Sequence, residues 1–162
     1  FRFSRHGERR LMFRWPKKAL FAIEAVLDIA YHTGAEPVQS KEITRRQGMP
    51  RRYLEQALQQ LVRHGILVGV RGPRGGYRLA RERKCISIGD IVRVVQGVGK
   101  QASKPDDMEG SELGIKVVRP LWTEIQDMLM ASLEELSIED LCGQAAKSGV
   151  VSEGRKALAF TI

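Results

Sequence analysis

The sequence predicts a mostly α-helical protein with one small β-hairpin, arranged as a winged helix-turn-helix domain followed by a long C-terminal helix. Three observations predict this fold. Two helical segments flank a tight Gly-Met-Pro turn, a Gly-rich hairpin follows them, and a long apolar pattern at helical spacing begins near residue 112. The 162 residues suit one domain with an added helical element.

The first predicted helix covers about residues 16–32, where apolar side chains recur at helical spacing. Pro16 suits the first helical position, and Gly34 and Pro37 end the pattern. Residues 1–11 have no periodicity and predict a flexible basic tail.

The helix-turn-helix pattern comes next. Ser40 is the candidate N-cap of a short helix that stops at Gly48. Pro50 and Gly65 then delimit a second helix with leucines along one face. Two helices separated by such a tight turn are typical of a helix-turn-helix.

The stretch VRGPRGGYRLA, residues 70–80, admits two interpretations, a phosphate-binding loop or a hairpin tip. A phosphate loop needs a helix and a Lys-Ser/Thr pair after its glycines, so that backbone N–H groups face the phosphates. Here a β-prone run follows, and another precedes at residues 66–70. The pattern therefore favours a hairpin, the wing of the fold.

The C-terminal part predicts three further helices. Ser87 and Asp90 have the spacing of a capping box. A long helix over about 112–136 contains Pro120, which either kinks it or marks its start, and Ser137 caps a short final helix. The expected organisation is a tail (1–11), the winged domain (12–97), a loop (98–112), the long and short helices (113–146), and a mobile tail (147–162).

Charge divides the chain. The formal net charge is +8, yet residues 1–100 hold 21 Lys/Arg against 8 Asp/Glu, and residues 101–162 hold 6 against 11. A basic part joined to an acidic part is typical of a nucleic-acid-binding domain with a separate assembly element. No apolar run approaches the ~18 residues that a membrane span requires, and no secretory signal is evident. We expect a cytoplasmic protein.

The candidate DNA-binding residues lie on the second helix of the pair and on the wing. The N-terminal end of such a recognition helix reaches base edges or phosphates, and Arg and Gln are suited to guanine and adenine. Glu55 has two interpretations, accepting from a cytosine amino group or balancing nearby arginines. The helix contributes Arg51, Arg52, Tyr53, Glu55 and Gln56, and the wing contributes Arg71, Arg74 and Arg78.

The long C-terminal helix carries an apolar band too wide for a lone surface helix, which predicts a partner. The band residues are Leu113, Val117, Leu121, Trp122, Ile125, Met128 and Leu129. Neither the three histidines nor the serines form a catalytic arrangement, so we expect no enzyme. Cys85 and Cys142 are too few for a disulfide framework or a Cys-rich metal site.

Several blocks together resemble the bacterial Rrf family of transcription regulators, of which IscR and CymR are typical. They are ALFAIEAVLDIAYH, the run from EITRRQGMPRRYLEQ through VRGPRGGYRLAR, ISIGDIVRVVQG, and the Leu121-Trp122 pair. The resemblance covers about residues 12–145. It implies a homodimer built on the long helix that binds a pseudo-palindromic operator in double-stranded DNA. It also implies base reading by residues 51–56 and a minor-groove contact by Arg71.

The resemblance has one departure. Cluster-binding members hold three cysteines in the loop before the long helix and a nearby histidine. Residues 97–112 contain no cysteine, and Lys116 and Arg119 stand where the last cysteine and the histidine are expected. Ammonium and guanidinium groups cannot replace thiolate ligands. We therefore expect no iron–sulfur cluster and no other cofactor, with Cys85 and Cys142 as the candidates for oxidation sensing.

The sequence thus predicts a homodimeric, sequence-specific DNA-binding regulator, a repressor, whose effector is a small molecule or a partner protein. The alternatives are a non-specific nucleic-acid-binding module and a protein-interaction module.

Overall fold

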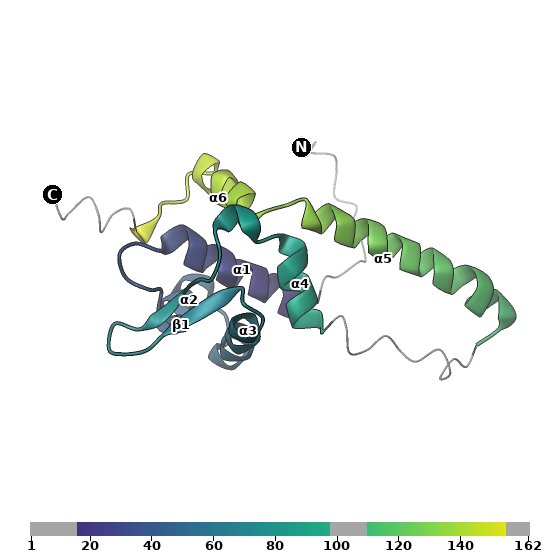
Figure 1. The fold of residues 1–162 in the computed structure, drawn as a ribbon, viewed down its shortest axis with the longest axis horizontal. Helices are drawn as coiled ribbons and strands as arrows, with labels where there is room; N and C mark the ends of the chain where they lie inside the picture. The colour runs from purple at the N-terminus through teal and green to yellow at the C-terminus, as the bar shows by residue number, and fades with distance from the viewer. Residues whose placement is uncertain (1–15, 98–109, 155–162) are drawn as a thin grey trace.

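The computed structural model describes residues 16–97 and 110–154, and these form a mostly helical fold with a two-stranded antiparallel hairpin (Figure 1). The helices are α1 (Lys17–His32), α2 (Ser40–Gln47), α3 (Arg51–Arg63), α4 (Ile88–Gln96), α5 (Arg119–Glu134) and α6 (Ile138–Lys147). The strands are β1 (Leu67–Val70) and β2 (Gly76–Leu79), and two short segments are the 3₁₀ turn η1 (Arg83–Cys85) and the π-helical η3 (Gly114–Val118). The predicted fold class is confirmed.

Helix α1 is the centre of the core. Ala19, Ala22 and Ala25 are completely buried on it, beside Val26 and Ile29. Alanines leave room for neighbouring backbones to approach, and α1 contacts α3, α4 and α6. The core therefore joins the helix-turn-helix to the C-terminal helices.

Local capping patterns decide several helix starts. At both Ser87 and Ser137, the serine hydroxyl accepts from the backbone of the aspartate three residues on, and that carboxylate accepts from the serine backbone. The sequence predicts this capping box at Ser87, and at Ser137 it predicts the serine cap alone. The prediction for Ser40 is wrong, because Ser40 is the first residue of α2. Gln39 holds the extended cap position, and its N–H donates to Glu42 Oε2 at 2.8 Å.

The hairpin is attached to the helix-turn-helix by its own backbone. Strands β1 and β2 pair in the register Leu67 to Leu79. On the other side of β2, Val38 forms an isolated bridge with Tyr77, with N–H to oxygen distances of 3.0 and 2.8 Å. Val38 lies between α1 and α2, so the wing and the helix pair share a hydrogen-bonded base.

Pro120 changes the geometry of the long helix rather than bending it away. A proline has no N–H, and its ring clashes with the carbonyl four residues earlier. The chain is π-helical over η3, where the Arg119 N–H reaches Gly114 O, and α5 then begins with Pro120 in its first turn. Only the end of α5 nearest α4 packs on the domain, and its other end projects outward (Figure 1).

The segment after α6 differs from the expected mobile tail. Residues 148–154 turn back onto α1 and α2, and Ser152 and Gly154 are buried there. This packing joins positions more than 100 residues apart, and no local pattern marks it. The predicted tail over 1–11 and most of the predicted loop over 98–112 lie outside the described residues. Among the helices described, none combines the length and the apolar character that a membrane crossing requires.

Candidate nucleic-acid interface

The N-terminal end of α3 exposes the predicted recognition residues. Leu54, Ala57, Leu58 and Leu61 are buried on the face toward the core. The other faces are solvent-accessible, so the first turn and a half of α3 presents cationic, phenolic and amide groups outward. The exposed residues there are Arg51, Arg52, Tyr53 and Gln56, and Glu55 is half-buried.

Arg51 and Glu55 form an ion pair across one turn of α3, with 2.7 Å between Nε and Oε1. In the free protein Glu55 therefore balances an arginine, one of its two predicted roles. Both side chains reach solvent, and an exposed pair of this kind contributes only about 0.3–0.5 kcal/mol. DNA can separate the two groups at little cost, so the pair leaves both available for base contacts.

The wing turn is closed by glycines. Gly72 has φ +112°, a conformation that side chains disfavour, and its carbonyl accepts from the Gly75 N–H at 2.9 Å. A Cβ on Gly75 would overlap the Val70 carbonyl and lie 2.8 Å from Gly72 O. Position 75 therefore needs a glycine because the protein's own backbone approaches it closely.

The three wing arginines differ in their surroundings. Arg71 is exposed at the turn. Arg74 has 84% of its side chain exposed and lies 3.6 Å from Glu36, a distance at which solvent weakens the attraction. Arg78 donates to the carbonyl of Ala35 and is half-buried, so it also holds the α1–α2 connection. Arg71 and Arg74 are the side chains at the tip that remain free to extend.

Two lysines outside the predicted set lie beside the recognition helix. Lys17 and Lys18 begin α1 and line a pocket together with Tyr53 and Gln56 of α3. Both lysines are exposed, so they extend the cationic surface from one helix start to the other. The signal was present in the sequence, as consecutive lysines directly after the proline that precedes a helix.

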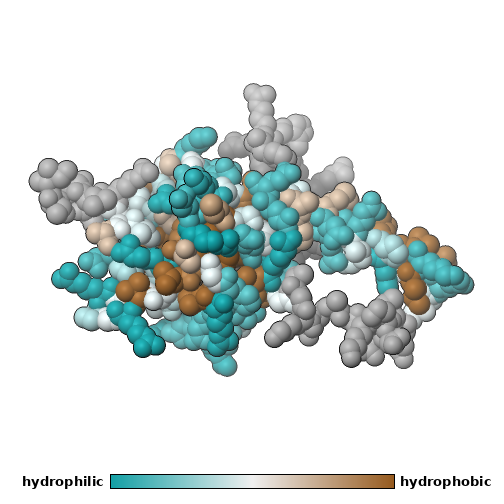
Figure 2. Space-filling model, in the orientation of Figure 1, coloured by the Kyte–Doolittle hydropathy of each residue, from teal (hydrophilic) through white to brown (hydrophobic). Residues whose placement is uncertain are grey.

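The apolar band of η3 and α5 is exposed in the part of the chain that the structure describes. None of the residues of α5 is buried, and Figure 2 shows hydrophobic side chains gathered at the projecting end. Isolated apolar residues are ordinary on a surface, but a continuous band marks an interaction site. The seven predicted interface residues are all exposed: Leu113, Val117, Leu121, Trp122, Ile125, Met128 and Leu129.

Comparisons with known proteins agree on one family. A family model described as "Rrf2: Iron-dependent Transcriptional regulator" matches residues 16–144. The chain is 33% identical over 129 residues to the HTH-type transcriptional regulator IscR of Sodalis glossinidius, covering 79% of this chain and 78% of the relative.

Two solved structures have the same fold. The structure of T. potens IscR superposes with a TM-score of 0.70 at 30% identity, covering 88% of this chain and 95% of that one. The global cysteine regulator CymR of B. subtilis superposes with a TM-score of 0.64 at 29% identity, covering 82% and 98%.

The residues present do not fit the iron that the family description implies. Cysteine thiolates hold iron–sulfur clusters, and the whole chain contains two cysteines. Cys85 is exposed in η1 and Cys142 is buried in α6. Within the described residues, no group of three or more His, Cys, Asp and Glu side chains is placed to hold a metal ion. We therefore derive no regulatory step through iron.

Proposed function

Because the chain belongs to the Rrf2 family of DNA-binding transcriptional regulators, we propose that it is a homodimer that recognises a specific operator and acts as a repressor. The observation that carries this proposal is that the domain exposes both the N-terminal end of α3 and the glycine-closed wing. Figure 1 shows α3 and the hairpin at the same edge of the domain, away from α6, and α3 contacts β1.

In the proposed complex the first residues of α3 enter the major groove. Arg52 and Gln56 are exposed there and match the donor and acceptor patterns of guanine and adenine. Arg71 reaches the adjacent minor groove from the wing, where a narrow A·T-rich stretch concentrates negative potential. Lys17 and Lys18 neutralise phosphates beside the recognition helix, which adds affinity without sequence preference.

The exposed apolar band on α5 supports the homodimer. A second copy of the same helix presents the same apolar surface, and a two-fold axis buries both at once. Such an axis also duplicates the recognition helix, so the two copies read half-sites about 34 Å apart, one turn of DNA. In this proposal the dimer represses where its operator overlaps a promoter, because it then excludes the polymerase.

The proposal is tested by selecting duplexes from a random-sequence pool with the full chain, then measuring affinity for the enriched and a scrambled duplex at fixed salt. We expect at least about a 1,000-fold preference for the enriched duplex. A ratio near one would instead support a non-specific nucleic-acid-binding module.

Two substitutions refine the test. Arg52→Ala and Arg71→Ala are expected to weaken binding to the enriched duplex by about 10-fold or more each, since a good base contact is worth about 1–3 kcal/mol. Lys147→Ala, at the far end of α6, removes the same charge from an exposed site distant from α3 and is the control. Equal affinities for all three variants would favour the protein-interaction alternative. A promoter carrying the enriched site upstream of a reporter then gives the sign of regulation.

A further inference from the structure

Helix α2 is held by few core contacts. Of its eight residues, only Ile43 is buried. A helix this short and polar cannot keep its orientation through packing alone. The ion pairs and hydrogen bonds of its polar residues must therefore supply much of what fixes α2 against α1.

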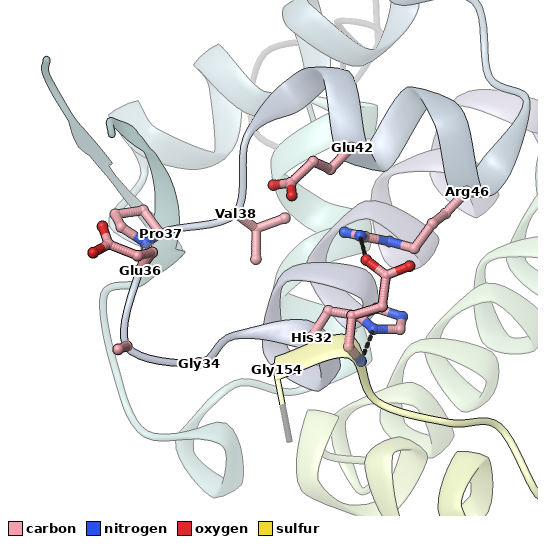
Figure 3. A pocket seen from close by; sticks show the side chains of 10 residues that line it. His32, Gly34, Glu36, Pro37, Val38, Glu42, Arg46 and Gly154 are labelled. Carbon is pink, nitrogen blue, oxygen red and sulfur yellow. Dashed lines mark hydrogen bonds and ion pairs between the residues drawn. The ribbon is translucent and has the colours of Figure 1, made fainter. Parts of the chain in front are cut away.

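The segment at residues 148–154, which we call the C-terminal strap, supplies some of those bonds after crossing the end of α1. The Tyr31 hydroxyl donates to Val150 O at 2.6 Å, and the Ser152 hydroxyl donates to Tyr31 O at 2.6 Å. The Glu153 N–H then donates to Nδ1 of His32 at 3.1 Å (Figure 3). Ser152 is only 5% exposed and Gly154 is also buried, so these two residues pack into the protein, whereas the rest of the strap is exposed.

Glycines bring the two backbones together at this crossing. A Cβ on Gly154 would lie 2.5 Å from His32 O and 2.7 Å from Thr33 O. A Cβ on Gly34 would lie 3.2 Å from Gly154 O. The strap can therefore reach α2 only because position 154 has no side chain.

Glu153 is the contact between the strap and α2. Its carboxylate lies 2.6 Å from Nη1 of Arg46 and 3.2 Å from Nη2 of Arg45. Arg46, whose side chain is 13% exposed, also donates two bonds to Asp28 of α1, at 2.9 and 2.6 Å. One guanidinium thus joins α1, α2 and the strap, and Figure 3 shows a dashed contact from Arg46 to a carboxylate oxygen.

We propose that the C-terminal strap is a positioning element of the helix-turn-helix: Glu153 fixes α2, and through α2 the recognition helix, although it lies 107 positions after Arg46 in the chain. Its consequence for DNA rests on the function proposed above.

The other end of the strap is fixed to the C-terminal helices. It leaves α6, in which Ile138 and Cys142 are buried against the core. The α5–α6 junction is itself bonded to the start of α4, through Ile88 N–H to Leu136 O at 2.8 Å and Ile138 N–H to Ile86 O at 2.9 Å. The strap therefore connects the dimerisation region to α2 by a route that does not pass through α3.

The test uses Glu153→Gln in the full chain, because positioning and simple electrostatics predict opposite results. Removing an acid from a DNA-binding protein should tighten DNA binding if charge alone acts. Loss of the strap contact should weaken it, by about 3-fold per strap and so about 10-fold for a dimer. Glu139→Gln removes the same charge from an exposed site on α6 that forms no ion pair within the described parts of the chain, and it is the matched control.

A second variant and a second readout keep the result independent of one substitution. Gly154→Val displaces the strap sterically and should reproduce the effect of Glu153→Gln. Hydrogen exchange of the α2 amides, measured without DNA, should rise about 3-fold in both variants while exchange in α4 is unchanged.

Faster α2 exchange together with weaker binding to the selected duplex supports the proposal. Unchanged exchange, or binding that is equal or tighter, overturns it. If the wild-type chain shows no preference among duplexes, the proposed function fails, and the exchange measurement alone still decides whether the strap holds α2.

Discussion

Replacing Leu121 by alanine should weaken the proposed dimer by an amount that the structure allows us to estimate. Burying a whole leucine side chain contributes about 1.5–3 kcal/mol. Leu121 has 54% of its surface exposed, so covering that exposed part in the dimer contributes about 1 kcal/mol in each protomer. A two-fold interface counts the residue twice, which gives about 2 kcal/mol and a dimer dissociation constant about 30-fold larger.

Sedimentation equilibrium over a concentration series measures that constant directly. Leu121 is not part of the buried core, so the variant should keep its folded protomer, which circular dichroism verifies. Asp127, six residues later, projects about 120° around α5 from Leu121 at helical geometry and is exposed. Asp127→Ala is therefore the control and should leave the constant within about 2-fold.

Two results would refute the reasoning. A wild-type chain that stays monomeric at every concentration would show that the apolar band has another occupant. A dimer equally sensitive to Leu121→Ala and Asp127→Ala would show that the interface is elsewhere on the helix.

Three further predictions concern the wing, the strap and iron. Gly75→Ala should lower the free energy of unfolding by about 1–3 kcal/mol, because the new Cβ overlaps the backbone. Gly143→Ala, in open space on α6, should raise the free energy of unfolding. Equal free energies for the two variants in denaturant titration would contradict the turn geometry. Burial lowers the pKa of His32 from 6.5, although Asp28, Glu153 and Glu42 raise it and Arg46 lowers it further. The folded state therefore favours the neutral ring, so the free energy of unfolding should fall as the pH drops below 6.5, and it should fall less in His32→Gln. A difference in this free energy between wild type and His32→Gln that does not change with pH contradicts the prediction. Protein purified without oxygen should lack the visible absorption of an iron–sulfur cluster. An absorption band together with stoichiometric iron and sulfide would show that the residues of this chain do bind a cluster.

Features set by neighbouring residues were predictable from the sequence. Ser87 and Asp90 specify a helix start within four positions, and the glycines of residues 70–80 specify a turn. The exposed end of α3 follows in the same way, since its leucine face identifies the side that must be buried. Such signals depend on local geometry alone, so the folded structure contains the features that they predict.

The strap and the start of α2 were missed for the opposite reason. Ser152 and Glu153 resemble any polar residues of a C-terminal tail until their partners on α1 and α2 are in place. Ser40 has the right residue type for a cap, but Glu42 bonds the backbone of Gln39 and moves the start. Where the packing of a segment depends on a partner far along the chain, or a helix start depends on competition between adjacent caps, residue type alone does not predict it.

The bridge between Val38 and Tyr77 ties the wing to the helix-turn-helix, so it also links the minor-groove and major-groove contacts proposed for them. Any side chain at position 76 would break that bridge, because its Cβ would lie 2.5 Å from Val38 O. One extra base pair between the two contacts shifts the DNA by about 3.4 Å along its axis and rotates it as well. Operators for this protein should therefore tolerate altered bases at each contacted site more readily than a single base pair inserted between the two sites. The wing thus fixes the spacing between them.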